Sequence, residues 1–384
     1  MTATARGIDR NEAKRTLCLA LELGETSWKL AFSVGLGQKP RERVITARDR
    51  DALLDEIARA KQRFGLSSRS RVVSCYEAGR EGFWLHRFLI AAGVDNRVVD
   101  AASIEVSRRR RHVKTDRMDA ERLLRLLVRE ALGEERVWAV VRVPTPEDED
   151  RRHLHRELLT AKRDRTRVTN RIQGLLANHG LRITWRRPLL PQLDALRLWD
   201  GTRLPAGLRA RIEREWERVE LLNRQIQALE AERREAIRVG RDRAMAQVRQ
   251  LVSLAGIGSN SAWLYVMEFF GWRRFRNRKQ VGSLAGLTPT PHQSGDEQRE
   301  QGIGRDGNRY VRGMAIEIAW GWLRYQPRSA LTRWYQRRFG RGSSRLRRIG
   351  IVALARKLLI ALWRFLETGV LPDGAMLAPA YRIR

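Results

Sequence analysis

Hydrophobic and polar residues follow two different periods in the first part of the chain, from Thr16 to about Val143. Short apolar runs bounded by turn residues predict strands over residues 16–23, 28–34, 71–77, 96–100 and 137–143. Helical spacing of the apolar positions predicts helices over 51–65, 83–93 and 121–132. Strands that alternate with helices are typical of a mixed α/β domain, which we expect over residues 1–145. Gly24 and Gly35 bound the second strand, so the first two strands are predicted to form a hairpin.

The second part of the chain, residues 146–248, has a heptad-like pattern. It follows an acidic, proline-containing segment, PTPEDED (144–150), which we expect to be a junction. Apolar residues recur at alternating four- and three-residue spacings at Leu154, Leu158, Ala161, Val168, Ile172 and Leu175, and again at Ile212, Val219, Leu222, Ile226, Leu229 and Ala236. This pattern predicts two coiled-coil helices, which pair either antiparallel within the chain or between subunits.

The third part, residues 249–384, consists of short helical patterns and glycine turns, and predicts a mostly helical domain with two helices leading up to Thr368. The segment LAGIGSNSA resembles the hairpin of a helix-hairpin-helix element. There, backbone N–H groups around Gly256 and Gly258 would meet a phosphate. The alternative is a tight turn between two packed helices.

Charge narrows the choice of partner. The chain has 76 Lys and Arg against 44 Asp and Glu, a net charge of +32. Such self-repulsion favours a polyanionic partner, and DNA or RNA fits better than a membrane surface. Arginine dominates, and its planar fork suits phosphate and guanine contacts. A GC-rich genome would explain the choice of arginine over lysine, but not the excess of positive charge.

Cysteine content and targeting signals exclude several classes of protein. Cys18 and Cys75 are too few for a disulfide framework or a zinc site, and we expect both to be small buried residues. The N-terminus leads into no signal-peptide apolar region, and the apolar run from Ile349 to Ala355 is too short for a membrane helix. We therefore expect an intracellular, cytoplasmic protein that associates with the nucleoid when it is bound to DNA.

Four carboxylates of the first domain occupy positions from which a metal site could be assembled. Glu22 and Glu77 come at the ends of predicted strands, and Asp116 and Asp119 open a predicted helix on one face. Hard oxygen ligands suit Mg²⁺, which supports phosphodiester cleavage. Each residue also has a structural explanation. Acids in a first helical turn are favoured by the helix dipole, and Glu77 before a glycine turn could simply be exposed.

A basic-aromatic run, GWRRFRNRKQ, follows the glycine turn of LAGIGSNSA in the last domain. Its cations are suited to phosphate contact and its aromatic residues to base stacking. The candidate nucleic-acid-binding residues here are Arg273, Arg274, Arg276, Arg278 and Lys279. Trp272 and Phe275 are three residues apart and could instead face the core together.

Several motifs, in order along most of the chain, carry a family resemblance. They are LALELGETSWKLAF, CYEAG, KTDRMDAERL, GIGSNSA, GLTPTPHQSG and GIGRDGNRYVRG. Together they resemble the DEDD-type insertion-sequence transposases whose targets are chosen by a bridge RNA. The resemblance implies a RuvC-like N-terminal domain of RNase H fold, with a metal site for Mg²⁺, or alternatively Mn²⁺, at Glu22, Glu77, Asp116 and Asp119. Glu22 is a departure, because the family usually has aspartate there, and Glu25 is the local competitor for this role.

The same resemblance gives Ser294 a role. Serine in the polar, glycine-containing loop HQSGDEQREQ is ordinarily a turn residue, but Ser294 occupies the family's QSG position, which implies a nucleophile that forms a covalent phosphoserine link to DNA. His292 and Asp296 are close in sequence, but nothing beyond proximity makes His292 a base. The arginines that could hold the scissile phosphate are Arg299, Arg305, Arg309 and Arg312.

The interpretation of the whole chain is therefore an insertion-sequence transposase that cleaves and rejoins DNA. The resemblance further implies a structured guide RNA, bound largely by the first domain and the coiled coil. It also implies an oligomer, a dimer or tetramer, that pairs two DNA duplexes, with the metal site and the serine acting together within or between subunits. Three alternatives remain: a hydrolytic nuclease or junction resolvase with a structural Ser294, a non-catalytic nucleic-acid-binding protein, and a coiled-coil scaffold.

Overall fold

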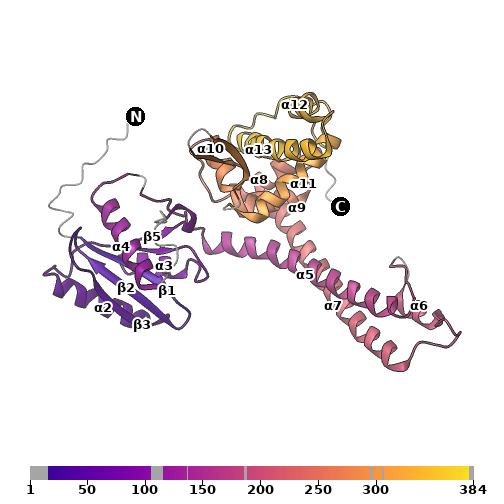
Figure 1. Cartoon of the computed structure of the whole chain (residues 1–384), viewed down its shortest axis with the longest axis horizontal. Helices are drawn as coiled ribbons and strands as arrows, with labels where there is room; N and C mark the ends of the chain where they lie inside the picture. Colours follow the sequence, from indigo (N-terminus) through magenta and orange to yellow (C-terminus); the bar gives the residue numbers. More distant parts are fainter. Residues whose placement is uncertain are drawn as a thin grey trace. The chain divides into compact units, whose positions relative to one another are not determined.

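The structure is a computed structural model of the chain and describes residues 16–104, 116–135, 137–185, 188–294, 297–304 and 307–379. The chain divides into two compact units, Met1–Val143 and Pro144–Arg384, each with its own hydrophobic core (Figure 1). No helix in the described ranges combines the length and apolarity needed to cross a membrane.

The first unit is built on a five-stranded mixed sheet. Its strands are β1 (Leu17–Leu23), β2 (Ser27–Ser33), β3 (Arg41–Thr46), β4 (Val72–Glu77) and β5 (Asp95–Val99). They lie in the order β3-β2-β1-β4-β5, with β1, β2 and β3 paired antiparallel and β1, β4 and β5 paired parallel. The predicted hairpin and the strands β4 and β5 are confirmed. The sequence did not predict β3.

Helices cover both faces of this sheet. Leu17, Leu19 and Leu21 of β1 pack with α2 (Arg50–Arg63) and α3 (Trp84–Ala91), whereas the alternate residues Cys18 and Ala20 pack with α4 (Asp116–Ala131). A single 3₁₀ turn, η1 (Ala101–Ser103), follows β5. Both cysteines are buried, as predicted, and burial raises the pKa of the Cys18 thiol to about 12. The fold class is thus α/β in this unit.

The predicted strand over residues 137–143 is wrong. The segment forms one isolated bridge, between Val140 and Val99, with backbone bonds from Asp100 N to Ala139 O (2.9 Å) and from Val141 N to Val98 O (2.7 Å). Only residues 139–141 bond to the end of β5, so the apolar run does not form a full strand.

Two long helices begin the second unit. They are α5 (Pro146–Ala177) and α7 (Ala206–Val239), joined through the short helix α6 (Leu189–Ala195). Lys162 pairs with Glu230 and Arg171 with Glu215, so the two helices run antiparallel within the chain, one of the two predicted arrangements.

The predicted junction PTPEDED does begin the second unit, but it is mostly helical. Pro146 is the first residue of α5, and the acids that follow it form the helix's first turn. Thr145 caps the helix and accepts a hydrogen bond from the Asp148 N–H (3.1 Å). The boundary between the units therefore falls directly at a helix start.

The rest of the unit is a mostly helical bundle with one β-hairpin. Its elements are α8 (Arg243–Val252), α9 (Ser259–Tyr265), the π-helical turn η3 (Val266–Phe270), α10 (Arg278–Leu284), β6 (Pro289–Ser294), β7 (Glu297–Ile303), α11 (Arg309–Tyr325), α12 (Ala330–Phe339) and α13 (Ser344–Thr368). Three helices, and not two, therefore lead up to Thr368. The segment around Ser294, expected to be a loop, is a strand end in an antiparallel hairpin.

The corner between α12 and α13 depends on a glycine. Gly350 is buried in α13, and a Cβ atom there would overlap the ring of Phe339 at the end of α12. The hydroxyl of Tyr335 also donates to the Arg347 carbonyl across the corner (3.3 Å). Because the ring lies against the bare backbone, the two helices cross more closely than any larger residue would permit.

We expect Gly350→Ala to lower the free energy of unfolding by about 1–3 kcal/mol, since the added methyl must displace a packed ring. Gly174 provides the matched control. It lies exposed in α5 with nothing within 4 Å of the position that a Cβ atom would take, so Gly174→Ala should stabilise the protein by up to about 1 kcal/mol. Denaturant unfolding of both variants checks the pair, and equal effects of the same sign would refute the packing argument.

Candidate functional site

Two of the four predicted carboxylates lie side by side at one edge of the sheet. Leu21 pairs with Tyr76 across the parallel strands β1 and β4, so the next residues, Glu22 and Glu77, are also neighbours in register. Strand alternation puts Glu22 on the face of Cys18 and Ala20, and Glu77 on the face of Cys75. Both carboxylates therefore belong to the face that α4 covers.

The direction of α4 brings its first turn to the same edge. Glu130, in the last turn, lies 3.9 Å from the Nε atom of Arg97, which binds Asp95 at the start of β5. Leu123, in the middle of the helix, accepts from the Cys75 thiol at 3.9 Å. The helix thus runs antiparallel to β4 and β5, and begins near their carboxyl ends. Asp116 and Asp119 belong to this first turn, and their side chains lie outside the described part of the structure.

A hollow of about 260 Å³ opens at this edge. Its lining includes Glu22, Glu25, Glu77, Arg80 and Glu81. Glu25 binds Arg80 (2.8 Å), and this hydrogen bond lowers the pKa of Glu25. An arginine therefore already engages Glu25, the competitor to Glu22.

The fit to a divalent cation depends on the acids of α4. Among the side chains that the structure describes, no group of three or more His, Cys, Asp or Glu could hold a metal ion. Glu22 and Glu77 supply two carboxylates, and the hard oxygen donors that they offer suit Mg²⁺. The first turn of α4 carries the further acids needed to complete such a site.

Ser294 ends β6, at the tip of the β6–β7 hairpin. Its backbone pairs with Glu297, and His292 lies opposite Arg299. The side chains of Ser294, His292 and Arg299 are outside the described part, as is the whole of Asp296 and Arg305. The structure thus places the backbone of the candidate nucleophile at the end of β6, and the geometry of its hydroxyl group lies outside the described part.

The two ends of this hairpin are held together by close backbone contacts. A Cβ atom on Gly307 would lie 2.6 Å from the Leu284 carbonyl oxygen, and the Asn308 N–H donates to that same oxygen (2.9 Å). Gly286, with φ of +65°, makes the turn before β6. This contact explains physically why the GLTP and GN segments, which lie on either side of the hairpin, both need glycine.

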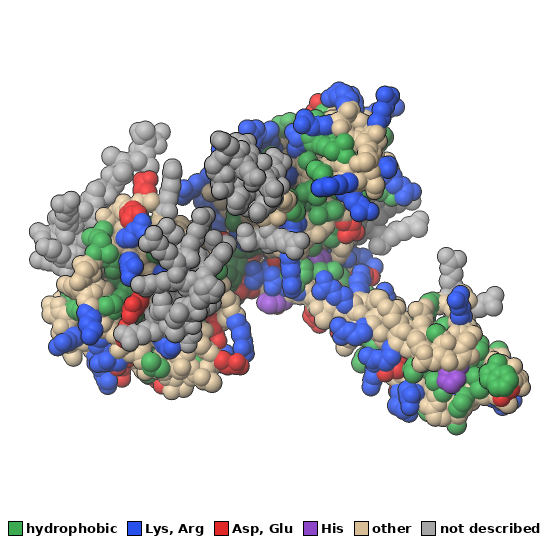
Figure 2. Space-filling model, in the orientation of Figure 1, with side chains coloured by type: hydrophobic (Ala, Val, Ile, Leu, Met, Phe, Trp, Pro, Cys, Tyr) green, Lys and Arg blue, Asp and Glu red, His purple; other side chains and the backbone are tan. Residues whose placement is uncertain are grey.

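The predicted basic residues have different surroundings. Trp272 is buried and Phe275 packs on Phe269, so these two aromatic residues do belong to the core, the alternative considered for them. Arg273 stacks on the Trp272 ring (4.3 Å to the centroid). The remaining cations of the run are exposed: Arg274, Arg276, Arg278 and Lys279. Lys and Arg side chains also follow α5 and α7 (Figure 2).

The glycine turn before α9 is packed within the bundle. Gly256 has φ of +87°, and a Cβ atom there would touch Tyr325 (3.0 Å). The neighbouring Ala255 N–H donates to the Met376 carbonyl (3.1 Å). Gly258 caps the seven-residue helix α9 and has nothing within 4 Å of a Cβ position. Of the pair, Gly256 has a clear packing role, while Gly258 is the one with open space beside it.

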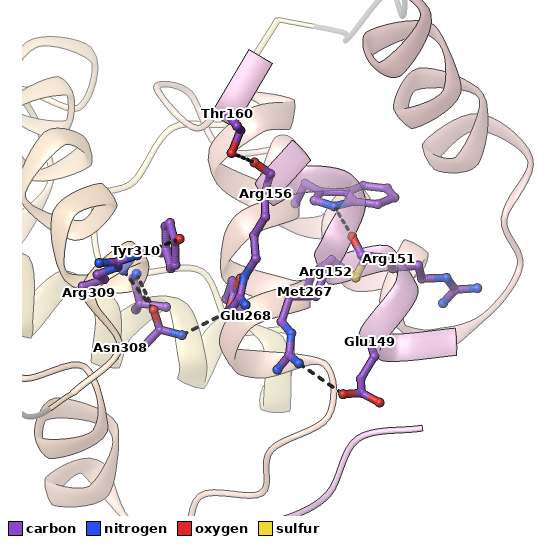
Figure 3. Close-up of polar contacts among 12 residues, drawn as sticks. Glu149, Arg151, Arg152, Arg156, Thr160, Met267, Glu268, Asn308, Arg309 and Tyr310 are labelled. Atoms are coloured by element: carbon purple, nitrogen blue, oxygen red, sulfur yellow. Dashed lines mark hydrogen bonds and ion pairs between the residues drawn. The ribbon is translucent and has the colours of Figure 1, made fainter. Parts of the chain in front are cut away.

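A buried carboxylate that the sequence interpretation missed organises the start of α11. Glu268 of η3 is 1% exposed and accepts two hydrogen bonds from Arg156 of α5 (2.7 and 3.0 Å). The side-chain amide of Asn308 also donates to it (3.1 Å) (Figure 3). Asn308 in turn caps α11, accepting from the N–H groups of Tyr310 and Val311 (2.9 and 3.2 Å). An acid inside the apolar run YVMEFFGW was the signal that could have revealed it.

Arginines surround Tyr310 immediately after this cap. The guanidinium of Arg309 lies 5.0 Å from the ring centroid and donates to the phenol oxygen (3.2 Å), and Arg156 lies 5.2 Å from the same ring (Figure 3). These cations hold the pKa of Tyr310 below its usual value. Arg312, one turn on, is half-buried and donates to the Gly307 carbonyl (3.4 Å). Arg309 is thus exposed and available to a phosphate, whereas Arg312 braces the hairpin's base.

Comparisons with known proteins indicate the family. The family model for the transposase IS116/IS110/IS902 family matches residues 248–335. A putative transposase, y4rJ, of Sinorhizobium fredii is 41% identical over 376 residues, which are 94% of each chain. A probable family 20 transposase of Pseudomonas aeruginosa is 28% identical over 59% of this chain and 66% of its own.

An α/β unit is followed here by a helical unit rich in arginine, and the relatives that share this sequence are named as transposases. The match along nearly the whole chain makes the assignment specific. The chain belongs to the IS116/IS110/IS902 family of transposases. It is accordingly an enzyme of DNA recombination.

Stability should depend on pH through His155, next to Arg156 in α5. Burial holds the pKa of His155 at about 4, below its ordinary value of 6.5, and neither ring nitrogen has a hydrogen-bond partner among the described residues. Protons therefore bind the unfolded chain more tightly. The stability that depends on neutral His155 is fully present above about pH 6.5. The free energy of unfolding is expected to fall by about 3 kcal/mol as the pH drops to about 4.

The measurement is urea unfolding of wild type and His155→Leu between about pH 7 and pH 4. The variant should lose this part of the pH dependence and keep the part due to carboxylates. His153→Leu, an exposed change on the same helix, is the control. Parallel curves for wild type and His155→Leu would contradict the assignment.

Proposed function

We propose that the first unit is a RuvC-like domain of RNase H fold that holds Mg²⁺, or Mn²⁺, through Glu22, Glu77, Asp116 and Asp119. The mixed sheet with helices on both faces supports this assignment, as does the position of the acids at the carboxyl ends of parallel strands, where open α/β sheets bind ligands. The single observation that carries the proposal is the register of β1 and β4. It makes Glu22 and Glu77 neighbours on the face that α4 covers.

Divalent cations held at this edge would neutralise charge that develops on phosphate oxygens during strand cleavage. The protein's own part is to hold the carboxylates in place. The strand ends fix Glu22 and Glu77, and the packing of Leu123 and Leu127 against the sheet fixes α4, so the acids need little rearrangement when DNA arrives.

Ser294 is the proposed nucleophile. Its hydroxyl oxygen forms a bond to the DNA phosphorus and loses its proton, while the bond to the departing nucleotide oxygen breaks and that oxygen gains a proton. The phosphoserine link conserves the energy of the phosphodiester, so a second strand's hydroxyl can reverse the step and join a new end. Exposed Arg309, next to the cap of α11, is suited to hold the phosphate during this exchange.

The motif resemblance and the net charge of +32 support two further parts of the proposal. The first is a structured guide RNA that selects the target, bound largely by the first unit and by α5 and α7. The second is an oligomer, a dimer or tetramer, that brings two duplexes together. A guide RNA and a second DNA duplex would each add phosphate groups that the positive charge of this protein can neutralise.

The decisive experiment is covalent trapping. The full chain, co-expressed with the RNA encoded beside its gene, is incubated with the element's end DNA and Mg²⁺ and then run on a denaturing gel. Wild type should give a protease-sensitive shifted DNA band. Ser294→Ala should give none, because the attacking oxygen is gone. Thr290→Ala, on the same strand, is the control and should keep the band.

The other outcomes separate the alternative functions. Metal-dependent cleavage without an adduct in either protein would assign a hydrolytic nuclease and make Ser294 structural. Binding without cleavage in wild type, unaffected by Asp119→Ala, would assign a non-catalytic binding protein. Either result would overturn the serine mechanism.

Glu22 offers a second test, because glutamate replaces the aspartate usual in the resembling family. Glu22→Gln removes a charged metal ligand and should lower Mg²⁺-dependent cleavage by at least about 100-fold, within the range that loss of charge stabilisation causes. Glu22→Asp keeps the carboxylate and should retain cleavage. Glu25→Gln, which only removes the partner of Arg80, should leave cleavage within a few-fold of wild type. If Glu25→Gln were the inactive variant, the ligand assignment would move to Glu25.

A further inference from the structure

The last two helices, α12 and α13, lie in a segment almost without acidic residues. Residues 318–366 contain no Asp or Glu and twelve Lys or Arg. Other runs without acidic residues, 165–193 and 269–295, are shorter, and α7 mixes both signs, with Glu213, Glu215 and Glu217 among its arginines. A stretch with one sign of charge over this length makes the local potential positive.

Seven of these cations cluster at the corner between α12 and α13. They are Arg333, Arg337, Arg338, Arg341, Arg345, Arg347 and Arg348, here called the α12–α13 arginine patch, and all are exposed. In the described part of the structure none of the seven forms a salt bridge, whereas arginines of α5 and α7 such as Arg171 and Arg209 do. Lys and Arg side chains are prominent in Figure 2 over the region that Figure 1 labels α12.

The corner that carries the patch is rigidly built. Phe339 packs on Gly350, Tyr335 donates to the Arg347 carbonyl, and Ser343 caps α13 through the Leu346 N–H (3.3 Å). Bringing seven like charges together costs electrostatic free energy that no carboxylate of residues 318–366 offsets. A polyanion that binds such a cluster would neutralise the repulsion among its arginines, so the cluster favours binding of a polyanion.

We propose that the α12–α13 arginine patch is a docking surface for the phosphate backbone of duplex DNA, separate from the hairpin that carries Ser294. The aromatic residues of the corner are not available for base stacking. Tyr335 and Phe339 are buried, and Lys357 covers the Trp334 ring (4.7 Å). A surface of arginines without exposed rings fits the outside of a duplex and not unstacked single strands.

DNA is favoured over RNA as the occupant because the chain's family consists of transposases, for which DNA is the substrate. The proposal does not depend on the metal site or on the serine, since binding requires no cleavage. Six of the seven patch residues lie beyond residue 335, where the match to the family model ends, and only Arg333 lies within it.

The test compares two triple variants of equal charge in the full chain. Arg341→Ala, Arg345→Ala and Arg348→Ala remove three members of the patch. Arg211→Ala, Arg214→Ala and Arg224→Ala remove three exposed arginines of α7 that form no salt bridge in the described structure. Binding to a labelled duplex of about 30 base pairs, of element-end and of scrambled sequence, is measured by fluorescence anisotropy over a range of salt concentrations.

Each phosphate contact contributes about 0.9 to the slope of log affinity against log salt. The patch variant should therefore lower the magnitude of that slope by about 2–3 and weaken binding about 100-fold near physiological salt, equally for both sequences. The α7 variant should keep its DNA affinity within a few-fold of wild type, because α7 is the surface proposed for the guide RNA and no RNA is present in this assay. Arg→Lys at the three patch positions should retain the slope, which loss of folding would not do.

Two results would overturn the proposal. In the first, the patch variant and the α7 variant have the same slope and the same affinity for DNA. In the second, the patch variant keeps its DNA affinity and loses affinity for an RNA duplex of equal length, which would make RNA the occupant.

Discussion

The carboxylate of Glu268 lies almost wholly out of contact with solvent, and the need to satisfy that buried charge constrains the second unit. Arg156 and Asn308 are the groups that do so, and they come from α5 and from the cap of α11. One side chain in a π-helical turn thus ties the long helix to the helix that follows the β6–β7 hairpin. Disturbing it would leave a charge buried and shift the segment that bears Arg309.

In the first unit the corresponding constraint is strand register. A one-residue slip between β1 and β4 would separate Glu22 from Glu77 and turn one strand's carboxylate away from α4. The apolar residues prevent this, because the leucines of β1 fit the α2 and α3 core and its small residues fit α4. The geometry of the acids is therefore a consequence of core packing several residues away.

Strands were predicted correctly from the sequence where apolar residues were nearly continuous. Strands β1 and β4 are nearly continuous in apolar residues, so their ends, and with them Glu22 and Glu77, could be located. The edge strand β3, RERVIT, buries only Ile45 and has the charged composition typical of edges, so its sequence gives little sign of a strand. Residues 137–143 gave the opposite error. The apolar run was present, but only Val140 forms a bridge to β5, with Val99.

The candidate site could be predicted in its residue types but not in its contacts. That Glu22 and Glu77 are neighbours follows from the order of strands, which periodicity does not specify. The role of Glu268 depends on partners 112 and 40 residues away. The arginines of the α12–α13 arginine patch, by contrast, are already close together in sequence, within residues 333–348, whereas the close crossing of the two helices depends on Phe339 and Gly350, which no periodicity pairs.

The antiparallel pair of α5 and α7 has a mechanical consequence. With 32 residues, α5 is about 48 Å long, comparable to the length of about 14 base pairs of duplex. Its base is clamped by Arg156 on Glu268, and the loop at its far end carries Trp199, 94% exposed. A rotation of this helix pair about its base would therefore move the far end more than the base. Ala177 at the far end of α5 is about 32 Å from Arg156, so a tilt of about 5° at the clamp displaces it by about 3 Å, enough to change the contacts made there.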